Sequence, residues 1–401
     1  MSELRPIFNA LMRGKTGALL LIMQVAVTLA IVSNAAFIIN DRLTYLHQET
    51  GLQDQNLFRF NLYTFGKQVD IRQQQEVDET LLRNIPGVAD AVVINQVPLS
   101  GSGDSTSFNL KPSPQQSQSE RAAFFMADEH LLNTLGVKLE EGRNFTAADV
   151  VYSQYYDKNA AVALVTRQFI DGLFPAGDGL GQTMYLGDIP LKIIGIVAPM
   201  KGPWLKDEKP DNVVLIPQVE GVAFKRVLVR TEAGRRDEVM QQVASVLLAS
   251  ESERVVSNIK GVDELLATYN SQDKLMSNML LVLICVLLLV TALGISGLAL
   301  FNVGRRTRQI GTRRALGAKK SDILRYFLLE NSLVSISGMI LGSILALAMS
   351  DVLMRHYSLP RLDNWFILYS LCGIYLMGML AVYWPALRAA QIAPSIATRN
   401  V

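Results

Sequence analysis

The stretch Asn302–Ala318 reads NVGRRTRQIGTRRALGA, and it lies between two apolar runs that are each long enough to cross a membrane. It holds five arginines within ten residues, and two lysines follow it directly: Arg305, Arg306, Arg308, Arg313, Arg314, Lys319 and Lys320. Loops on the cytoplasmic side of a membrane are enriched in Lys and Arg. The stretch therefore predicts a cytoplasmic loop, and the topology of the rest of the chain follows from it.

Four apolar runs predict four transmembrane helices. Half of the 401 residues are apolar and 18% are charged, and a helix crosses a bilayer with about 20 apolar residues. We place the spans at residues 17–40, 275–303, 323–350 and 365–387. Each must be helical, because backbone groups in hydrocarbon need hydrogen-bond partners within their own segment.

The first span has an alternative interpretation as a cleavable signal peptide. Its apolar stretch is longer than the core of a signal peptide usually is. Gln24 and Asn34 lie within it, and polar side chains in a span generally face other helices. We therefore favour a retained helix whose two amides point toward its neighbours.

Basic residues near both ends of the chain predict that the termini, residues 1–16 and 388–401, are cytoplasmic, like the loop 304–322. Residues 41–274 then form a large domain on the outside, and residues 351–364 form a short outside loop. The large outside segment contains 23 Lys+Arg against 31 Asp+Glu, a balance of −8, although the whole chain carries +2. Both cysteines, Cys285 and Cys372, fall in predicted spans, so the outside domain has no disulfide available.

The outside segment begins and ends with β-α-β patterns, which indicate an α+β domain. The first is a strand at Asn56–Thr64, a helix at Asp70–Asn84 and a strand at Val88–Ile94. The second is a strand at Arg226–Thr231, a helix at Arg235–Ala249 and a strand at Glu253–Ile259. Between them, short apolar runs separated by Gly and Pro predict a β-rich inserted subdomain at about residues 100–190.

The segment Gly261–Lys274 leads into the second span with a helical pattern and no internal Gly or Pro. We expect one uninterrupted helix there, which would act as a stiff rod. A flexible tether of helical composition is the alternative.

The sequence offers no assembled catalytic, metal or cofactor site. Gly14-Lys15-Thr16 resembles the end of a nucleotide-binding P-loop, but Asn9 stands where that motif requires glycine. The three histidines, His47, His130 and His356, are scattered, and no spacing matches a zinc site. We therefore expect a non-catalytic chain that binds neither cofactor nor nucleic acid, with any ATP and magnesium held by a separate subunit.

Two features of the third span point to helix packing and to an intramembrane polar group. Gly338, Gly342, Ala346 and Ser350 recur every four residues, a small-residue stripe that lets two helices approach closely. The stripe is compatible with packing inside the chain and with self-association. Glu330 lies about two turns into the same helix, where a carboxylate usually faces protein or a cavity. A structural partner such as an arginine from the cytoplasmic side is the default expectation, ahead of a proton relay.

Several spaced motifs resemble the MacB/FtsX family of ABC-transporter permease subunits. Arg305–Ala318, RRTRQIGTRRALGA, is similar to the family's R-x-x-E/Q-I-G-x-R-x-A-L/I-G-A signature, and Pro385–Pro394, PALRAAQIAP, to its P-A-x-x-A-A-x-x-x-P ending. In the outside domain, Leu135–Phe145 with Asp149, and Leu173–Gly181 before Ile194–Val197, resemble the MacB-type periplasmic core.

This resemblance implies a permease of the bacterial inner membrane with four helices, a large domain between the first two, and assembly as a dimer of permeases with two ATPase subunits. The loop after the second span would be the coupling helix that docks on the ATPase. The docking residues carried over to this chain are Arg308, Ile310, Gly311, Arg313, Arg314, Leu316 and Gly317. MacB carries its ATPase fused before the first span, so a separately encoded ATPase is expected here.

The second permease could be an identical or a homologous chain, and a periplasmic membrane-fusion adaptor and an outer-membrane channel could join the complex. From the residues of the basic loop alone, docking on a partner and simple anchoring to anionic lipids are equally favoured. Two other functions remain open: a conduit that passes solute through the helices, and a membrane-anchored sensor or hydrolase.

Overall fold

The computed structural model describes residues 15–46, 48–65, 70–113, 117–154, 157–357 and 360–393. The expected N-terminal segment 1–16 and tail 388–401 lie largely outside these residues. The chain divides into two compact units. We call residues 15–46 and 273–393 the helical unit, and residues 48–272 the α/β unit.

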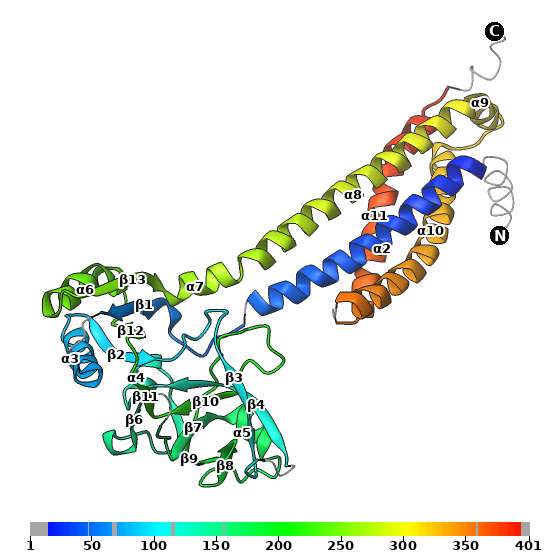
Figure 1. Cartoon of the computed structure of the whole chain (residues 1–401). Helices are drawn as coiled ribbons and strands as arrows, with labels where there is room; N and C mark the ends of the chain where they lie inside the picture. Colours follow the sequence, from blue (N-terminus) through cyan, green and yellow to red (C-terminus); the bar gives the residue numbers. More distant parts are fainter. Residues whose placement is uncertain are drawn as a thin grey trace. The chain divides into compact units, whose positions relative to one another are not determined.

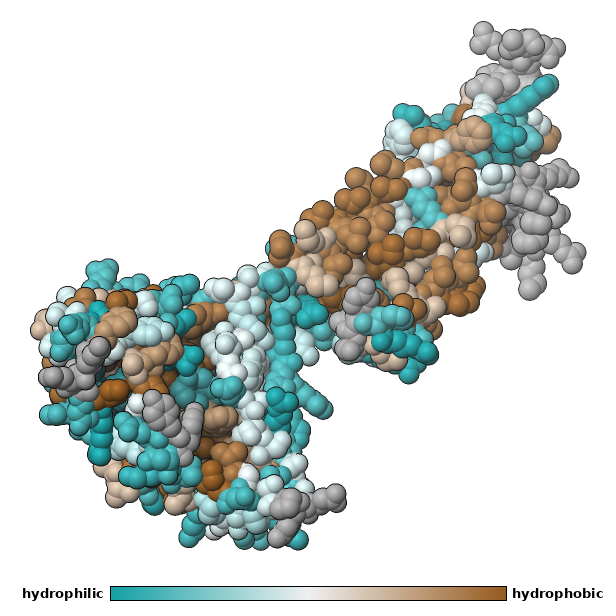
Figure 2. All heavy atoms as spheres, viewed as in Figure 1, coloured by the Kyte–Doolittle hydropathy of each residue, from teal (hydrophilic) through white to brown (hydrophobic). Residues whose placement is uncertain are grey.

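The helical unit contains four long helices (Figure 1), which confirms the four predicted apolar segments. They are α2 (Lys15–Leu46), α8 (Ser271–Arg305), α10 (Lys320–Tyr357) and α11 (Asn364–Ala390). A short helix, α9 (Thr307–Ala315), connects α8 to α10. Each long helix extends a few residues beyond the predicted span, because polar residues at both ends continue the helix. All four are long and apolar enough to cross a membrane, and Figure 2 shows apolar residues covering much of this unit's visible surface.

Polar side chains inside the helical unit join its helices. The Gln24 amide donates to the carbonyl of Val290 at 3.1 Å, and the Asn34 amide donates to the carbonyl of Ala346 at 3.1 Å. The hydroxyls of Thr28 and Thr291 lie 2.8 Å apart. The prediction that Gln24 and Asn34 face neighbouring helices is therefore confirmed.

The first sheet of the α/β unit has four antiparallel strands in the order β13-β1-β12-β2. They are β1 (Leu57–Thr64), β2 (Val88–Ile94), β12 (Phe224–Thr231) and β13 (Arg254–Gly261), with α3 (Ile71–Arg83) and α6 (Arg236–Ser250) as the crossover helices. Phe58, Phe60 and Leu62 of β1 are buried together with α6 side chains, as their alternation predicts. The two predicted β-α-β units thus interleave in one sheet, the ferredoxin-like arrangement.

The second sheet closes on itself. Its strand order is β5-β9-β7-β10-β4-β3-β8, and β8 also pairs with β9. The strands are β3 (Ser105–Asn109), β4 (Ser119–Met126), β5 (Leu139–Gly142), β7 (Val162–Thr166), β8 (Thr183–Leu186), β9 (Ile189–Val197) and β10 (Val213–Ile216). A separate two-stranded sheet pairs β6 (Val151–Ser153) with β11 (Gln218–Glu220). The short helices of this unit not yet named are η1 (Asp54–Asn56), η2 (Ala147–Asp149), α4 (Leu131–Leu135) and α5 (Arg167–Leu173). An apolar core that includes Phe108, Phe169 and Ile193 fills this small barrel.

Two sequence-based expectations need correction. The inserted subdomain does not end near residue 190, because β9 and β10 complete its sheet and carry it to Ile216. The helix expected across residues 261–274 is not continuous. β13 runs to Gly261, α7 (Val262–Tyr269) ends at the buried Asn270, and α8 begins at Ser271. The N–H of Asn270 closes the last turn of α7 on the carbonyl of Leu266.

Candidate functional site

The connection between α8 and α10 is a short helix with a defined end at each side. α8 stops at Arg305, and Arg306 leaves helical geometry before α9 begins at Thr307. At the other end Gly317 has φ +98°, and its N–H donates to the carbonyl of Arg314 while that of Ala318 donates to Arg313. This is a Schellman ending, which needs a left-handed residue and so favours glycine. Gly317 therefore ends α9 and turns the chain into α10, and its part in docking on an ATPase stays a prediction.

One side of α9 is buried within the helical unit. Ile310 is 5% exposed and packs in the cluster that contains Ile323 and Phe327 of α10. Gly311 is buried as well. The Arg313 guanidinium lies 5.0 Å from the centre of the Tyr326 ring. Ile310 and Gly311, which the sequence suggested for docking, therefore hold α9 on α10 in this structure.

The other side of α9 is open. Arg308 is exposed, and Leu316 is 84% exposed, which is unusual for a leucine next to a packed helical core. Arg305, Lys319 and Lys320 are exposed beside them, while Arg314 is half-buried. We call the exposed residues Arg308, Leu316, Lys319 and Lys320, three basic and one apolar, the α9 surface.

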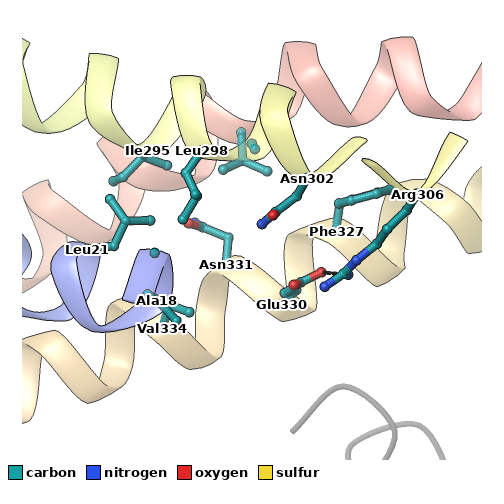
Figure 3. Close-up of a pocket in the computed structure, with 13 residues that line it drawn as sticks. Ala18, Leu21, Ile295, Leu298, Asn302, Arg306, Phe327, Glu330, Asn331 and Val334 are labelled. Carbon is teal, nitrogen blue, oxygen red and sulfur yellow. Dashed lines mark hydrogen bonds and ion pairs between the residues drawn. The ribbon is translucent and has the colours of Figure 1, made fainter. Parts of the chain in front are cut away.

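Arg306 connects this turn to the interior of the unit (Figure 3). Its guanidinium donates to Glu330 Oε2 at 2.8 Å, as Figure 3 shows. It also donates to the Tyr326 hydroxyl at 3.2 Å. Glu330 is 5% exposed, so a charged carboxylate there requires a partner of opposite sign. An arginine from the basic loop supplies that partner, which is the structural pairing expected for Glu330.

A small cavity lies beside this ion pair. It has a volume of about 60 Å³ and is lined by side chains from all four long helices, including Asn302, Glu330 and Asn331. Glu330 Oε1 has no hydrogen-bond partner among the described residues. A cavity of this size has room for a few water molecules, and water beside Glu330 would complete the hydrogen bonding of its carboxylate.

The small-residue stripe of α10 packs against α2. A Cβ on Gly338 would lie 2.8 Å from Val25 Cβ, and one on Gly342 would lie 2.9 Å from the carbonyl oxygen of Ala26. Ala346 accepts the hydrogen bond from Asn34, and Ser350 accepts one from the N–H of Leu362 at 3.1 Å. Of the two interpretations left open by the sequence, the structure shows the packing inside the chain.

The α/β unit contains a charged network that sequence reasoning missed. Arg83 of α3 contacts Glu79 at 3.3 Å, Asp90 of β2 at 3.1 Å and Asp128 at 3.2 Å. His130 lies 3.0 Å from Asp90. Only the Glu79–Arg83 spacing is visible as an i,i+4 pair in the sequence, because the other acids come from distant strands and loops.

The environment shifts the pKa values of this network in different directions. Burial, with the nearby charge of Asp128, raises the pKa of Glu79 well above its ordinary value. The hydrogen bond to Asp90 raises the pKa of His130. Burial opposes ionisation of Asp90, but hydrogen bonds from His130 and Asn133 outweigh it and lower the pKa of that carboxyl. The network ties α3, β2 and the start of α4 together, and no nucleophile stands within it.

Within the described part of the chain, no three His, Cys, Asp or Glu side chains gather in a way that could hold a metal ion. Cys285 and Cys372 are free. His356 meets the carbonyl of Val352 on its own helix, and His47 lies outside the described residues.

Comparison with known proteins identifies the class. The MacB-like periplasmic core domain matches residues 17–246, and the FtsX-like permease C-terminal domain matches residues 281–394. The first match alone covers more than half of the chain. The protein therefore belongs to the MacB/FtsX family of permeases, the membrane components of ABC transporters.

Its relatives include larger proteins. The macrolide export ATP-binding/permease protein MacB of Azoarcus sp. is 30% identical over 276 residues, which cover 64% of this chain and 40% of that protein. The pyoverdine export ATP-binding/permease protein PvdT of Pseudomonas aeruginosa is 27% identical over 276 residues, which cover 63% of this chain and 39% of that protein. The matched part of this chain thus spans about two fifths of the length of these relatives.

Solved structures with partial similarity include the periplasmic region of MacB from Actinobacillus actinomycetemcomitans, with a TM-score of 0.32, 15% identity and coverage of 56% of this chain and 97% of that one. The extracellular domain of the noncanonic ABC-type transporter YknZ also has a TM-score of 0.32 and 15% identity, and the match covers 50% of this chain and 100% of that one.

Proposed function

We propose that this chain is the permease subunit of an ABC transporter and that it couples ATP hydrolysis in a separate ATPase subunit to movement of its α/β unit outside the membrane. Such movement would drive export or extraction of a substrate without passing it through the helices. The family membership and the four apolar helices support this proposal. The single observation that carries it is the α9 surface: Arg308 and Leu316 are exposed on or directly after a helix whose other side, at Ile310 and Gly311, is buried.

The way α9 is attached supports a coupling role. Ile310 packs on α10, the Arg313 guanidinium lies over Tyr326, and Arg306 pairs with Glu330. A partner that moves α9 must therefore displace α10 or break these contacts. A ligand shifts a conformational equilibrium only through contacts that differ between the two states, and nucleotide binding in the partner would supply that difference.

The polar side chains of the helices argue against a solute conduit. Gln24, Asn34 and Asn331 donate to backbone carbonyls of neighbouring helices. Groups used in this way fix helices against each other. Because these polar groups join the helices to each other, they favour transmission of movement over passage of solute.

The complete assembly that we propose contains two permeases, identical or homologous, and two ATPase subunits in the bacterial inner membrane, with both termini of this chain cytoplasmic. A periplasmic adaptor, with an outer-membrane channel, is a further proposed partner. ATP and magnesium would bind to the ATPase subunits.

The test is the stimulation of the ATPase by the permease. A complex of the tagged chain with the ATPase that copurifies with it is reconstituted into lipid nanodiscs. Arg308→Ala with Leu316→Ala removes one charge and the apolar side chain of the α9 surface. The few residues that dominate an interface each contribute about 2 kcal/mol or more, so we expect stimulation to fall by about tenfold or more if Arg308 and Leu316 are among them.

Val352→Ala with Arg355→Ala is the matched control, because it removes one exposed apolar and one exposed arginine side chain at the opposite end of α10. It should leave stimulation unchanged. Full stimulation by the α9 variant, at wild-type levels of membrane insertion, would contradict the proposed coupling site.

A further inference from the structure

Two adjoining cavities lie on the α/β unit. One, of about 410 Å³, has a mainly polar lining that includes Arg59, Asn61, Gln96 and Ser102. The other, of about 500 Å³, has a mainly apolar lining that includes Ile94, Phe124, Met126 and Val222. Asn95, Asp104, Phe224 and Arg226 line both cavities. They therefore form one continuous depression with a polar half and an apolar half, which we call the Arg59–Arg226 groove.

The pleat of the first sheet explains why two arginines meet there. Phe58, Phe60 and Leu62 of β1 point into the core, so Arg59 and Asn61 point to the opposite face. Arg226 of β12 lies directly across from Asn61 in the register. Arg59 and Arg226 are therefore diagonal neighbours on the same face, close enough for their side chains to interact.

The two guanidiniums are held by neutral groups. Arg59 donates to Asn61 Oδ1 at 2.9 Å, and Arg226 donates to the carbonyl of Asn95 at 2.7 Å. Among the described residues neither guanidinium has an ion pair with a carboxylate, although Asp104 also lines the groove. Arg59 Nε is buried and has no partner among these residues. Burial and the charge of Arg226 lower the pKa of Arg59.

Two like charges side by side on a sheet destabilise it, and an anion between them would relieve that repulsion. Guanidinium groups bind carboxylate and phosphate through paired hydrogen bonds. The polar half of the groove thus has the chemistry of an anion site.

The apolar half continues directly from the arginines. The Phe224 ring lies beneath the Arg226 guanidinium at 5.1 Å and packs against Tyr63 at 4.6 Å. Tyr63 and Val222 remain 40% and 41% exposed. Exposed apolar groups gathered in a groove mark a binding surface, and the adjacent cationic pair indicates what kind of molecule fits.

We propose that the Arg59–Arg226 groove binds an anionic amphiphile, with its acidic headgroup between the two guanidiniums and its apolar chain along Phe124, Met126 and Phe224. The occupant would be a single lipid-like molecule. The proposed coupling role requires neither this groove nor its ligand. The test described below uses no ATP. Failure of one proposal therefore leaves the other standing.

The probe is palmitic acid that carries a diazirine on its chain, added to the full chain in nanodiscs of phosphatidylcholine. After illumination, labelled peptides are identified by mass spectrometry. We expect saturable labelling of the peptides that contain Phe124, Met126 or Phe224. Loss of charge-assisted hydrogen bonds in Arg59→Gln with Arg226→Gln should reduce this labelling by about tenfold, and the methyl ester of the probe should label as weakly as the double variant.

Arg235→Gln is the matched control, because Arg235 is an arginine at the start of α6, which packs on the opposite face of the sheet. It should label like the unchanged chain. A thermal unfolding curve shows whether the double variant remains folded, and unchanged labelling by a folded double variant overturns the proposal. Equal labelling by acid and ester overturns it as well. Inorganic phosphate should compete only weakly, because it lacks the apolar chain. Displacement of the probe by phosphate at the same concentration as the probe would show that the chain adds nothing to binding and would reject the amphiphile.

Discussion

Gly342 lies where α10 crosses α2, and it tests whether the small-residue stripe holds this chain together. An added Cβ would come within 2.9 Å of the carbonyl oxygen and 3.0 Å of the Cα of Ala26. Backbone atoms cannot move aside cheaply, so Gly342→Val should destabilise the helical unit by about 1–3 kcal/mol, a cost typical of overpacking. Thermal unfolding of the purified chain in nanodiscs measures this loss.

Gly297→Val provides the comparison, because a Cβ at Gly297 of α8 meets nothing within 4 Å. It should leave the unfolding temperature nearly unchanged. Similar losses for both variants would mean that the cost comes from valine in a helix and not from the α2–α10 contact.

Single residues also show what sequence spacing alone leaves undecided. Ile310 and Leu316 are both apolar residues within the same basic stretch, and the family resemblance gave them the same role. Ile310 is 5% exposed, whereas Leu316 is 84% exposed. Ile310 lies on the face of α9 that meets α10, whereas Leu316 directly follows the last residue of that helix. The helix is too short and too basic for an apolar pattern to predict which face is buried.

At the scale of elements, the charged network that joins α3, β2 and α4 makes stability depend on pH. The pKa of His130 is raised above its ordinary 6.5 by the hydrogen bond to Asp90. The contribution of the Asp90–His130 contact to the free energy of unfolding is therefore complete below about pH 6.5, and it is lost as the pH rises through the raised pKa of His130. Because 37% of the His130 side chain is exposed, solvent screening keeps the effect small, on the order of 0.5 kcal/mol.

We expect His130→Gln to be less stable than the unchanged chain at about pH 5.5, and the gap to close by about pH 8.5. Thermal unfolding at both pH values measures the gap. His356→Gln serves as the control, since its ring meets the carbonyl of Val352 and lies outside the network. A gap that widens with rising pH would show that the Asp90–His130 contact does not act through the charged histidine.

The elements that the sequence located best are those with a strong local pattern. β2 begins and ends at the predicted residues, and β1, α3 and α6 differ by one or two residues, because alternation and helical spacing are local properties of the chain. The end of the inserted subdomain was placed wrongly because it depends on a distant pairing. β10 joins the barrel through parallel pairing of Val213 with Ala123, which no local pattern reveals.

Some of the candidate sites could likewise be predicted from local sequence, and others form only in the folded chain. The basic stretch, the small-residue stripe and Glu330 were visible as residue types in unusual places. The partner of Glu330 could be predicted as an arginine from the loop, because a buried carboxylate requires one. The Arg59–Arg226 groove could not be predicted, since it is formed by residues from β1, β12 and the segment after β2 that meet only in the folded sheet.

At the scale of the whole molecule, charge is distributed unevenly between the segments on either side of the predicted membrane spans. The loop between α8 and α10 is basic, whereas residues 41–274 carry a balance of −8. The positive-inside rule predicts that the basic loop is cytoplasmic, and the α/β unit, which follows α2 and precedes α8, would then be outside. The coupling proposal requires this arrangement, because a motor on one face must act on a domain on the other.

Labelling of single cysteines in intact spheroplasts tests that arrangement directly. After Cys285 and Cys372 are replaced by alanine, Asp178→Cys places a thiol on the exposed surface of the α/β unit, and Lys319→Cys places one on the exposed α9 surface. A membrane-impermeant maleimide should label the first variant in intact spheroplasts and the second only after lysis, because a charged reagent does not cross the bilayer. Labelling of both thiols before lysis would put the α9 surface and the α/β unit in one compartment, and an ATPase on the cytoplasmic side could then not reach α9.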